Sequence, residues 1–319
     1  MLPRQDSDRS NIGEDSSNAS FRPLIFGEVL FDHFPDGARV PGGAPFNVAW
    51  HLQGFKAHPL LISGVGADAA GDELLDRMAR WGMDPRGVQL HHQHPTGRVV
   101  AEFEDGTPSF RIEANQAYDS VETGRLPPPP QLSETQLFYH GTLAIREETS
   151  RMTVGYLRDT VQCPVLVDVN LRPPWWNRAL VDWALTGVDC VKLSREEAAL
   201  LIEAPVASRT EQSEAVYRLR DRYQAKLVVM TLGAAGVIAV ADGGIVRQKA
   251  PPIRDVQDTV GAGDAFSAVL ALGINLDWPL SVTLRRATEF AGEVCRHRGA
   301  TQSDCSLYDL QRARWNHEQ

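Results

Sequence analysis

Apolar runs of strand length alternate with stretches of helical periodicity along most of this chain. Residues 23–29 predict a first buried strand, and residues 44–53 predict a helix behind a Gly-Gly turn. The same alternation predicts further strands over 58–63, 136–140, 164–169, 189–193 and 227–231, and helices over 70–81, 146–161, 195–203, 208–223 and 265–274. Strands that alternate with helices favour a mostly parallel sheet with helices on both faces. The pattern therefore predicts an α/β fold of three layers.

One region departs from this rhythm. Between about residues 96 and 118, alternating apolar runs flank Glu104-Asp105-Gly106-Thr107, a sequence typical of a hairpin turn. Residues 31–41 are predicted to add another short strand pair. Together they predict a small β-sheet lid over the edge of the main sheet where open α/β sheets bind ligands. The alternative is a surface insertion without a function.

Length and composition indicate one domain with a sizeable core. The chain has 319 residues, of which 43% are hydrophobic and 23% charged. The first 20 residues are rich in Ser, Asp and Asn and are expected to be a disordered leader, and residues 312–319 are expected to be a frayed tail. The domain is therefore expected over residues 21–311.

The charge balance and the missing motifs exclude several classes of function. A net charge of −9 argues against extended binding to nucleic acid or to an anionic membrane. No apolar run is long enough to cross a bilayer, and the four cysteines form no Cys-x-x-Cys pair, so we expect a reduced, cytoplasmic protein. The chain has neither a complete Gly-x-Gly-x-x-Gly fingerprint nor a Walker A sequence, which disfavours nicotinamide and P-loop chemistry.

The most specific chemistry lies at the start of the predicted helix over 265–274. Gly261, Ala262 and Gly263 precede it directly, where free N–H groups and the helix dipole attract an anion and small side chains let a phosphate approach. Asp264 would enter the first turn, within reach of a hydroxyl that attacks phosphorus, and could take its proton. Taken alone, the run is also consistent with an ordinary glycine turn before a helix.

Two further segments place polar groups beside predicted strands or turns. Gly42-Gly43 lets the backbone approach a polar ligand, and Asn47 can both donate to and accept from hydroxyl groups. Asp168 ends a buried strand, and Arg172 follows it, where a guanidinium could face a transferring phosphate. A structural turn and a buried Asp–Arg pair are the alternatives.

Two other strand ends could serve a nucleotide. Lys192 precedes Ser194 and Glu197, which match a capping box, although the Glu197 carboxylate could also hold a water molecule of Mg²⁺. Thr231 comes before two glycines, Gly233 and Gly236, and its hydroxyl could meet phosphates. The alternative for this last segment is a simple glycine turn.

These segments together resemble the ribokinase-like (PfkB) carbohydrate kinases, over about residues 23–304. Gly42-Gly43 with Asn47, and the run from Asp258 to Asp264, are similar to the two hallmark motifs of that family. Gly27-Glu28 with Asp32, and Asp168-Val169-Asn170-Leu171-Arg172, look most like fructokinases. The resemblance implies a ribokinase-like three-layer α/β/α fold with a β lid.

The resemblance also implies ATP-dependent phosphorylation of a primary hydroxyl of a monosaccharide, with Mg²⁺. The residues implied for the transfer itself are the base Asp264, the anion hole of Gly261, Ala262 and Gly263, and the phosphate-facing Arg172. Those implied to contact the sugar are Asp32, Gly42, Gly43 and Asn47. Those implied to contact the nucleotide and its metal are Lys192, Thr231, Gly233, Gly236 and, through water, Glu197. The chain departs from the family's Asn-x-x-Glu pattern, because Ser194 stands at the Asn position.

Fructose is the first expectation for the acceptor, giving fructose 6-phosphate. Ribose, another ketose and 2-keto-3-deoxygluconate are the next alternatives, followed by a nucleoside, and a non-catalytic sensor of sugar or nucleotide is the rival from another class. We expect the sugar to be chosen by lid residues, with Arg98, Glu102, Arg111 and Gln116 as candidates. A monovalent cation and a homodimer formed through the lid are further expectations.

Overall fold

A computed structural model describes residues 22–104, 107–128 and 132–317. The expected leader over residues 1–20 lies outside these ranges, as do residues 105 and 106 of the predicted hairpin turn. The main sheet has nine strands in the order β13-β12-β11-β10-β9-β8-β1-β4-β5. Its strands are β1 (Pro23–Phe26), β4 (Leu60–Gly66), β5 (Val88–His91), β8 (Leu137–His140), β9 (Val165–Asp168), β10 (Cys190–Ser194), β11 (Leu227–Thr231), β12 (Val237–Ala241) and β13 (Gly244–Gln248). The neighbours from β5 to β11 pair in parallel, and β12 and β13 add an antiparallel edge.

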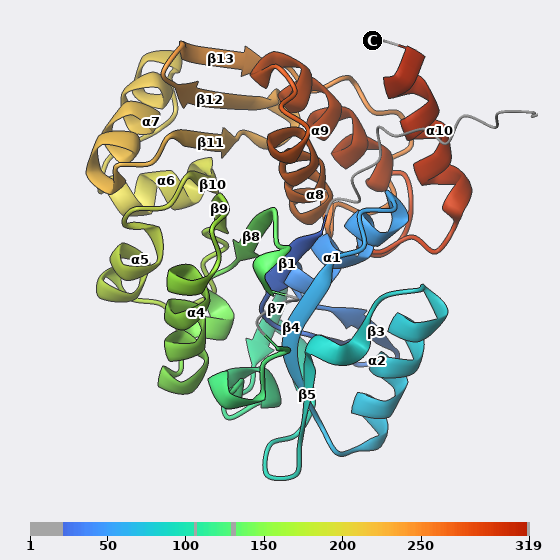
Figure 1. The fold of residues 1–319 in the computed structure, drawn as a ribbon. Helices are drawn as coiled ribbons and strands as arrows, with labels where there is room; N and C mark the ends of the chain where they lie inside the picture. The colour runs from blue at the N-terminus through green and yellow to red at the C-terminus, as the bar shows by residue number, and fades with distance from the viewer. Residues whose placement is uncertain (1–21, 105–106, 129–131, 318–319) are drawn as a thin grey trace, which may run out of the picture.

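Helices cover both faces of this sheet, as the alternating pattern predicts (Figure 1). One face carries α1 (Ala44–Gly54), α2 (Ala69–Arg80), α8 (Ala262–Asn275), α9 (Leu280–Val294) and α10 (Cys305–His317). The other carries α4 (Glu148–Thr160), α5 (Arg178–Leu185), α6 (Arg195–Ile202) and α7 (Arg209–Tyr223). Short 3₁₀ turns are η1 (Pro85–Gly87), η2 (Ala117–Ser120), η3 (Thr123–Arg125), η4 (Leu143–Ile145) and η5 (Gly233–Ala235).

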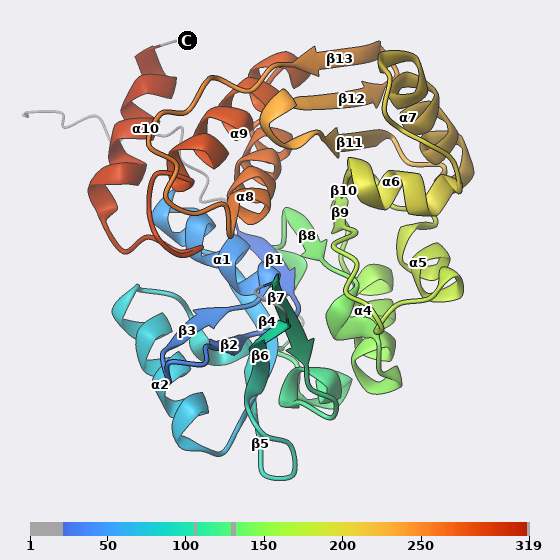
Figure 2. The same ribbon diagram turned by 180° about the vertical axis from the view of Figure 1, so that it is seen from behind.

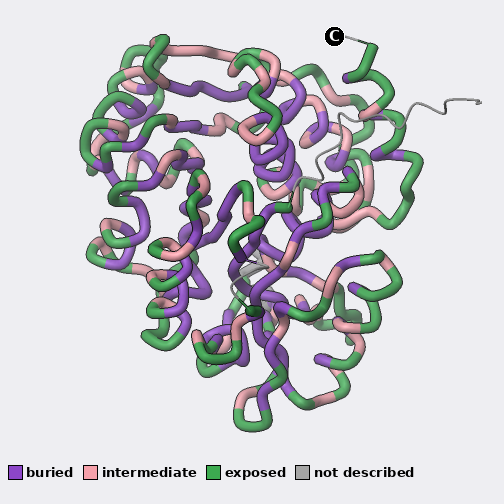
Figure 3. The backbone as a smooth tube through the Cα atoms, in the orientation of Figure 1, coloured by how far each residue is buried: buried purple, intermediate pink, exposed green. Residues whose placement is uncertain are grey.

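Successive strand residues point to opposite faces, which divides the core in two. In β1, Leu24 and Phe26 pack with α4 to α7, whereas Ile25 packs with α1 and α8. The buried backbone accordingly runs through the centre of the molecule in Figure 3. The three-layer α/β/α architecture is confirmed.

The helix starts follow from local sequence. The Asp68 side chain accepts a hydrogen bond from the Gly71 N–H at 2.8 Å at the start of α2, and Asn177 does the same for Leu180 at the start of α5. Both α6 and α7 begin with a capping box of Ser and Glu. The predicted box at Ser194 is therefore present.

The lid is a separate four-stranded sheet in the order β3-β2-β6-β7. It is built from β2 (Leu30–His33), β3 (Arg39–Gly42), β6 (Gly97–Glu104) and β7 (Thr107–Ile112), which lie side by side in Figure 2. The sequence predicted one strand over 23–29, but the chain leaves the main sheet after Phe26 and enters the lid at Leu30. The bend lies at Gly27, where a β carbon would come within 2.2 Å of Pro45 Cγ.

The strand register shows which lid residues share a face with Asp32. Asp32 lies opposite Val99, and Val99 lies opposite Ile112, so these three form one row on one face. Arg98 and Arg111 stand at the alternate positions and therefore point to the other face, contrary to their expected contact with the sugar.

The two remaining lid candidates fare differently. Gln116 is 2% exposed, and its side-chain amide donates to the Ala114 carbonyl at 2.7 Å. It therefore supports the start of η2 from within the core. The Glu102 side chain lies outside the part of the chain whose side chains the structure describes.

The last helix extends the folded domain beyond the expected boundary at residue 311. Residues 312–317, expected as a tail, belong to α10, and Trp315 is only 4% exposed. Its ring stacks on Phe55 at 5.1 Å and meets Trp278 at 5.4 Å, and Arg286 donates to its carbonyl at 2.8 Å. An aromatic side chain at residue 315 anchors a helix whose polar composition suggested fraying.

Two other expectations concern the outside of the molecule. In the described ranges, no helix combines the length and the apolar composition that crossing a bilayer requires. The lid edges β3 and β7 carry exposed apolar side chains, Val40 at 39% and Phe110 at 54%. A dimer through the lid stays a prediction, which sedimentation equilibrium would test.

We expect Trp315→Ala to destabilise the fold by about 3–5 kcal/mol, the usual cost of removing a buried Trp side chain. Leu310→Ala on the same helix is the matched control, because Leu310 is 64% exposed and should change stability by less than about 0.5 kcal/mol. Urea unfolding of both variants measures the difference. Equal free energies of unfolding for the two variants would show that α10 does not anchor the domain.

Candidate active site

The carboxyl ends of the parallel strands meet at one edge of the sheet, and the predicted site residues gather there. Asp168 is the last residue of β9 and pairs in register with Lys192 of β10. The start of α8 approaches the same edge, because Ser267 of α8 donates to the Asp168 carboxylate at 2.9 Å. This is the edge where open α/β sheets bind their ligands.

The start of α8 has the features of an anion site. Gly261 is the N-cap with φ 79°, and a β carbon there would lie 2.4 Å from Ala300 Cβ, so both its backbone and its surroundings require glycine. Ala262 donates weakly to the Thr259 carbonyl at 3.3 Å. The N–H groups of Gly263 and Asp264 occupy first-turn positions, for which an α-helix provides no acceptor. Gly263 is exposed, so a phosphate oxygen can reach these groups.

Asp264 is held by the other hallmark motif. Asn47 Nδ2 donates to Asp264 Oδ2 at 2.7 Å, which joins α1 to α8. Burial raises the pKa of Asp264 from 3.8 to about 6, while the Asn47 hydrogen bond and the charges of Lys192 and Arg172 oppose that rise. A carboxyl with this pKa is ionised at neutral pH and is still basic enough to accept a proton from a hydroxyl during reaction.

Lys192 lies beside the anion site but is paired with another acid. Its Nζ donates to Asp168 Oδ2 at 2.8 Å, and that oxygen also accepts from Ser267 and, at 3.4 Å, from Tyr139. A β carbon at Gly263 would lie 3.3 Å from Lys192 Nζ. Burial alone would lower the pKa of Lys192, but Asp168 and the nearby Glu197 and Asp264 raise it, so the ammonium stays charged.

The two glycines of the Gly42-Gly43 turn each make room for an acid. A β carbon at Gly42 would come within 2.5 Å of Asp32 Oδ2, and one at Gly43 would come within 2.4 Å of the Glu28 carbonyl and 3.2 Å of its Cγ. Burial raises the pKa of Asp32 from 3.8 to about 6, with Arg172 opposing. The turn therefore brings a carboxyl from the lid to the same edge as Asp264.

Glu28 is a site residue to which the sequence analysis gave no role. It is 3% exposed, and its Oε2 is buried with no hydrogen-bond partner among the described residues. Burial raises its pKa from 4.5 to about 7, Arg172 and the Ala44 N–H lower it, and Asp264 raises it. In the sequence, only its place in the Gly27-Glu28 pair that resembles fructokinases drew attention to it.

Arg172 is the cation that these acids share. It is exposed, and its positive charge lowers the pKa values of Glu28, Asp32 and Asp264. An exposed guanidinium beside an anion site can reach an incoming phosphate. The charge of Arg172 therefore acts both on Asp32 of the lid and on Asp264 of α8.

Both carboxylate oxygens of Glu197 accept hydrogen bonds from the backbone. One carboxylate oxygen accepts from the Leu171 N–H and the other from the Ser194 N–H, both at 2.7 Å. These bonds tie the start of α6 to the loop that carries Arg172. Among the described residues, no group of three or more His, Cys, Asp or Glu side chains could hold a metal. The remaining lone pairs of Glu197 can accept from a water molecule, which fits its expected indirect role.

The segment after β11 lies at the same edge of the sheet. Of its two glycines, Gly236 is required by the local turn. Thr231 lies opposite Ser194 in register, and its hydroxyl donates to the Leu193 carbonyl at 3.3 Å. Gly233 is exposed with φ 58°. Gly236 has φ 107°, and a β carbon there would lie 2.1 Å from the Gln248 carbonyl oxygen, so the turn itself requires this glycine.

Comparison with known proteins gives consistent matches. The family model for the pfkB family carbohydrate kinases matches residues 21–306. A fructokinase of Salmonella typhimurium is 28% identical over 287 residues, which cover 85% of this chain and 90% of the relative. A cytidine kinase of Thermococcus kodakarensis is also 28% identical, over 86% of this chain and 96% of the relative. The crystal structure of a Xylella fastidiosa fructokinase with bound ATP has the same fold, with a TM-score of 0.81 at 22% identity over 92% of this chain and 99% of that one.

We expect the Asp264 carboxyl to titrate near pH 6, because burial outweighs the groups that favour its ionised form. Removing the opposing hydrogen bond in Asn47→Leu should raise this pKa further. Carboxyl ¹³C NMR measures both values, with Asp264→Asn to assign the signal and Asn275→Leu, at the other end of α8, as the control. A pKa near 3.8 in the wild type, or no change in Asn47→Leu, would contradict this picture.

Proposed function

The chain belongs to the pfkB family and is a carbohydrate kinase, and from this premise we propose that it transfers the γ-phosphoryl group of ATP to a primary hydroxyl of fructose, giving fructose 6-phosphate. The observation that carries the proposal is the position of Asp264. Its carboxylate lies in the first turn of α8, beside N–H groups that can bind a phosphate, and is held there by Asn47. A base and an anion site in one helical turn suit the attack of a hydroxyl on phosphorus.

In the proposed mechanism, Asp264 accepts the proton of the sugar hydroxyl as that oxygen attacks. ATP supplies the phosphoryl group. The N–H groups of Gly263 and Asp264 and the Arg172 guanidinium stabilise the negative charge that develops on its oxygens. Lys192 adds a positive field beneath Gly263 while remaining paired with Asp168.

We propose that the sugar lies between the lid and the start of α1. Asn47 Oδ1 is buried and has no hydrogen-bond partner among the described residues, so it can accept from a sugar hydroxyl. Asp32 offers a second acceptor from the lid row that includes Val99 and Ile112. A lid over this site would exclude water and limit hydrolysis of ATP.

For the nucleotide, we propose that Thr231 and Gly233 contact its phosphates. We propose that Mg²⁺ enters with them and is held through a water molecule on Glu197. Magnesium commonly keeps several water ligands in such sites and takes its other oxygens from phosphates. The fixed orientation of Glu197, from two backbone hydrogen bonds, would place such a water near the loop that carries Arg172.

Fructose is favoured over other acceptors by the fructokinase relatives and by the run from Asp168 to Arg172. The cytidine kinase relative at equal identity shows that the family relationship does not determine the acceptor. Ribose, 2-keto-3-deoxygluconate and a nucleoside are therefore the alternatives to test.

We expect Asp264→Asn to lower kcat by a factor of about 10²–10⁴, the usual contribution of a positioned base. In the wild type, kcat/KM should fall as pH drops through about 6, because protonation of Asp264 removes the base. Steady-state kinetics across pH measures both effects. A variant with near-wild-type kcat would rule out Asp264 as the base.

The acceptor is tested by ADP release with Mg-ATP and a panel of fructose, ribose, glucose, 2-keto-3-deoxygluconate, adenosine, cytidine and no acceptor. We expect kcat/KM for fructose to exceed the others by at least tenfold. A larger kcat/KM for another compound would overturn fructose and identify the acceptor class instead.

A further inference from the structure

A buried arginine outside the site joins the lid to the loop that carries Arg172. The Arg146 side chain is 3% exposed and is paired with Asp119, which is 1% exposed. Its Nε donates to Asp119 Oδ1 at 2.8 Å and its Nη2 donates to Oδ2 at 2.7 Å. A planar guanidinium bound in this two-pronged way has a fixed orientation, unlike a lysine ammonium.

The first side of this junction is the lid. Strand β7 ends at Ile112, and Nη2 of Arg146 also donates to the carbonyl of the next residue, Glu113, at 2.6 Å. The ring of Tyr118, in η2 beyond the lid, lies 5.4 Å from the guanidinium. Arg146 therefore holds the segment through which the lid returns to the main domain.

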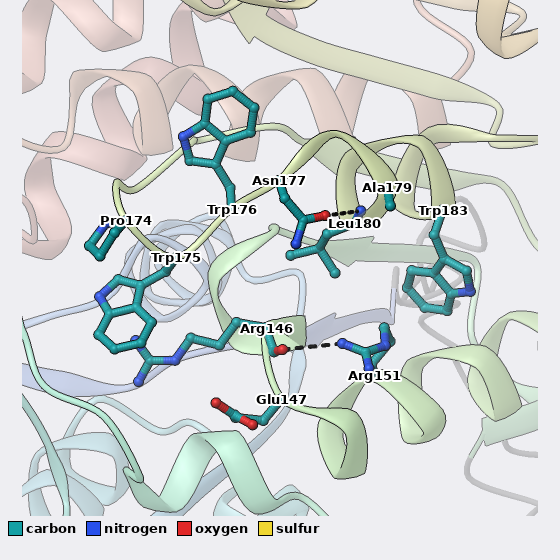
Figure 4. A pocket seen from close by; sticks show the side chains of 10 residues that line it. All are labelled: Arg146, Glu147, Arg151, Pro174, Trp175, Trp176, Asn177, Ala179, Leu180 and Trp183. Carbon is teal, nitrogen blue, oxygen red and sulfur yellow. Dashed lines mark hydrogen bonds between the residues drawn. The ribbon is translucent and has the colours of Figure 1, made fainter.

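The second side is the loop after β9. The Trp175 ring lies 4.2 Å from the Arg146 guanidinium, and Figure 4 shows the indole over the arginine side chain. The backbone N–H of Trp175 donates to the Arg172 carbonyl at 2.7 Å, so the two residues belong to one turn. A shift of Trp175 is therefore transmitted to the backbone of Arg172.

The surroundings leave room for such a shift. One pocket of about 490 Å³, open to solvent, lies between the start of α4 and α5 and is lined by Arg146, Trp175 and Trp183. A second, of about 680 Å³, separates β7 from the loop and is lined by Phe110, Pro173 and Trp175. Trp175 thus borders open space on the side of the lid and on the side of the main domain.

The junction also contains an unsatisfied donor. Arg146 Nη1 is buried with no hydrogen-bond partner among the described residues. Leaving a buried charged donor unpaired costs free energy, so a second arrangement that supplies an acceptor would be favoured. A buried ion pair adds little net stability compared with apolar residues of the same shape, so stability alone does not account for an arginine here.

We propose that Arg146 is a positioning residue that couples the lid to Arg172, so that closure over the sugar and the approach of Arg172 to the phosphate occur together. The proposal rests on the kinase function but not on the identity of the acceptor. If the coupling is lost, Arg172 can act while the lid is open. The phosphoryl group of ATP is then transferred to water as well as to the sugar.

The test is Arg146→Lys, which keeps the charge beside Asp119 but loses the two-pronged contact and the planar face. We expect kcat for sugar phosphate to fall about tenfold and KM for the sugar to rise, with KM for ATP changed less than twofold. The ratio of ADP released to sugar phosphate formed should rise above one. A purely structural role would reduce the active fraction and leave this ratio and both KM values unchanged.

Arg158→Lys is the matched control. Arg158 lies on α4 and is half-buried, faces the Trp183 ring at 5.6 Å and donates to three carbonyls around the end of α5. Within the described part of the chain, none of these contacts involves the lid or the Arg172 loop. If Arg146→Lys does not fold, Trp175→Leu cuts the same link and leaves the Asp119 pair intact, while Trp175→Phe should restore the ratio. Each assay uses whichever acceptor of the panel turns over, so an error in the choice of fructose leaves the test valid. A ratio of one in both Arg146→Lys and Trp175→Leu would overturn the coupling.

Discussion

The Asp264 carboxylate must be shielded from water without being neutralised, and much of the surrounding structure meets that constraint. A direct salt bridge to Lys192 would stabilise the charge and make the group a poor base. Lys192 instead donates to Asp168, which Ser267 and Tyr139 hold in place. The ammonium therefore contributes its field from a distance, and the neutral amide of Asn47 makes the direct contact.

The same constraint explains some of the glycines around the site. Gly42 makes room for the Asp32 carboxylate, whereas Gly43 is required by its φ of 105° and by the Glu28 backbone carbonyl, which would lie 2.4 Å from a β carbon there. Gly261 is needed for its backbone angle and for Ala300, whereas Gly263 keeps the approach to Lys192 open. Gly42 and Gly263 thus allow a charged group to come closer than a methyl group would permit.

The sequence predicted the layers, most strands and the edge of the sheet where the candidate site residues gather, because these depend on local periodicity and on motifs at strand ends. It did not predict the break at Gly27, since the apolar run continues across the bend from one sheet into another. The faces of Arg98 and Arg111 follow from strand register, which a hairpin pattern leaves undetermined. The junction at Arg146 joins residues 113, 119 and 175, and no local pattern connects them.

The contact between Asn47 and Asp264 spans 217 positions of the chain, and α1 and α8 pack directly against each other. During synthesis, the main sheet, the lid and α1, which carries Asn47, emerge well before α8. A nascent chain that ends after β13 therefore contains the residues proposed to bind the sugar, but it lacks Asp264 and the start of α8, the proposed base and anion site. The apolar sheet face that α8 and α9 cover stays exposed until these helices have been synthesised. Aggregation is therefore most favoured while the last sixty or so residues are being added.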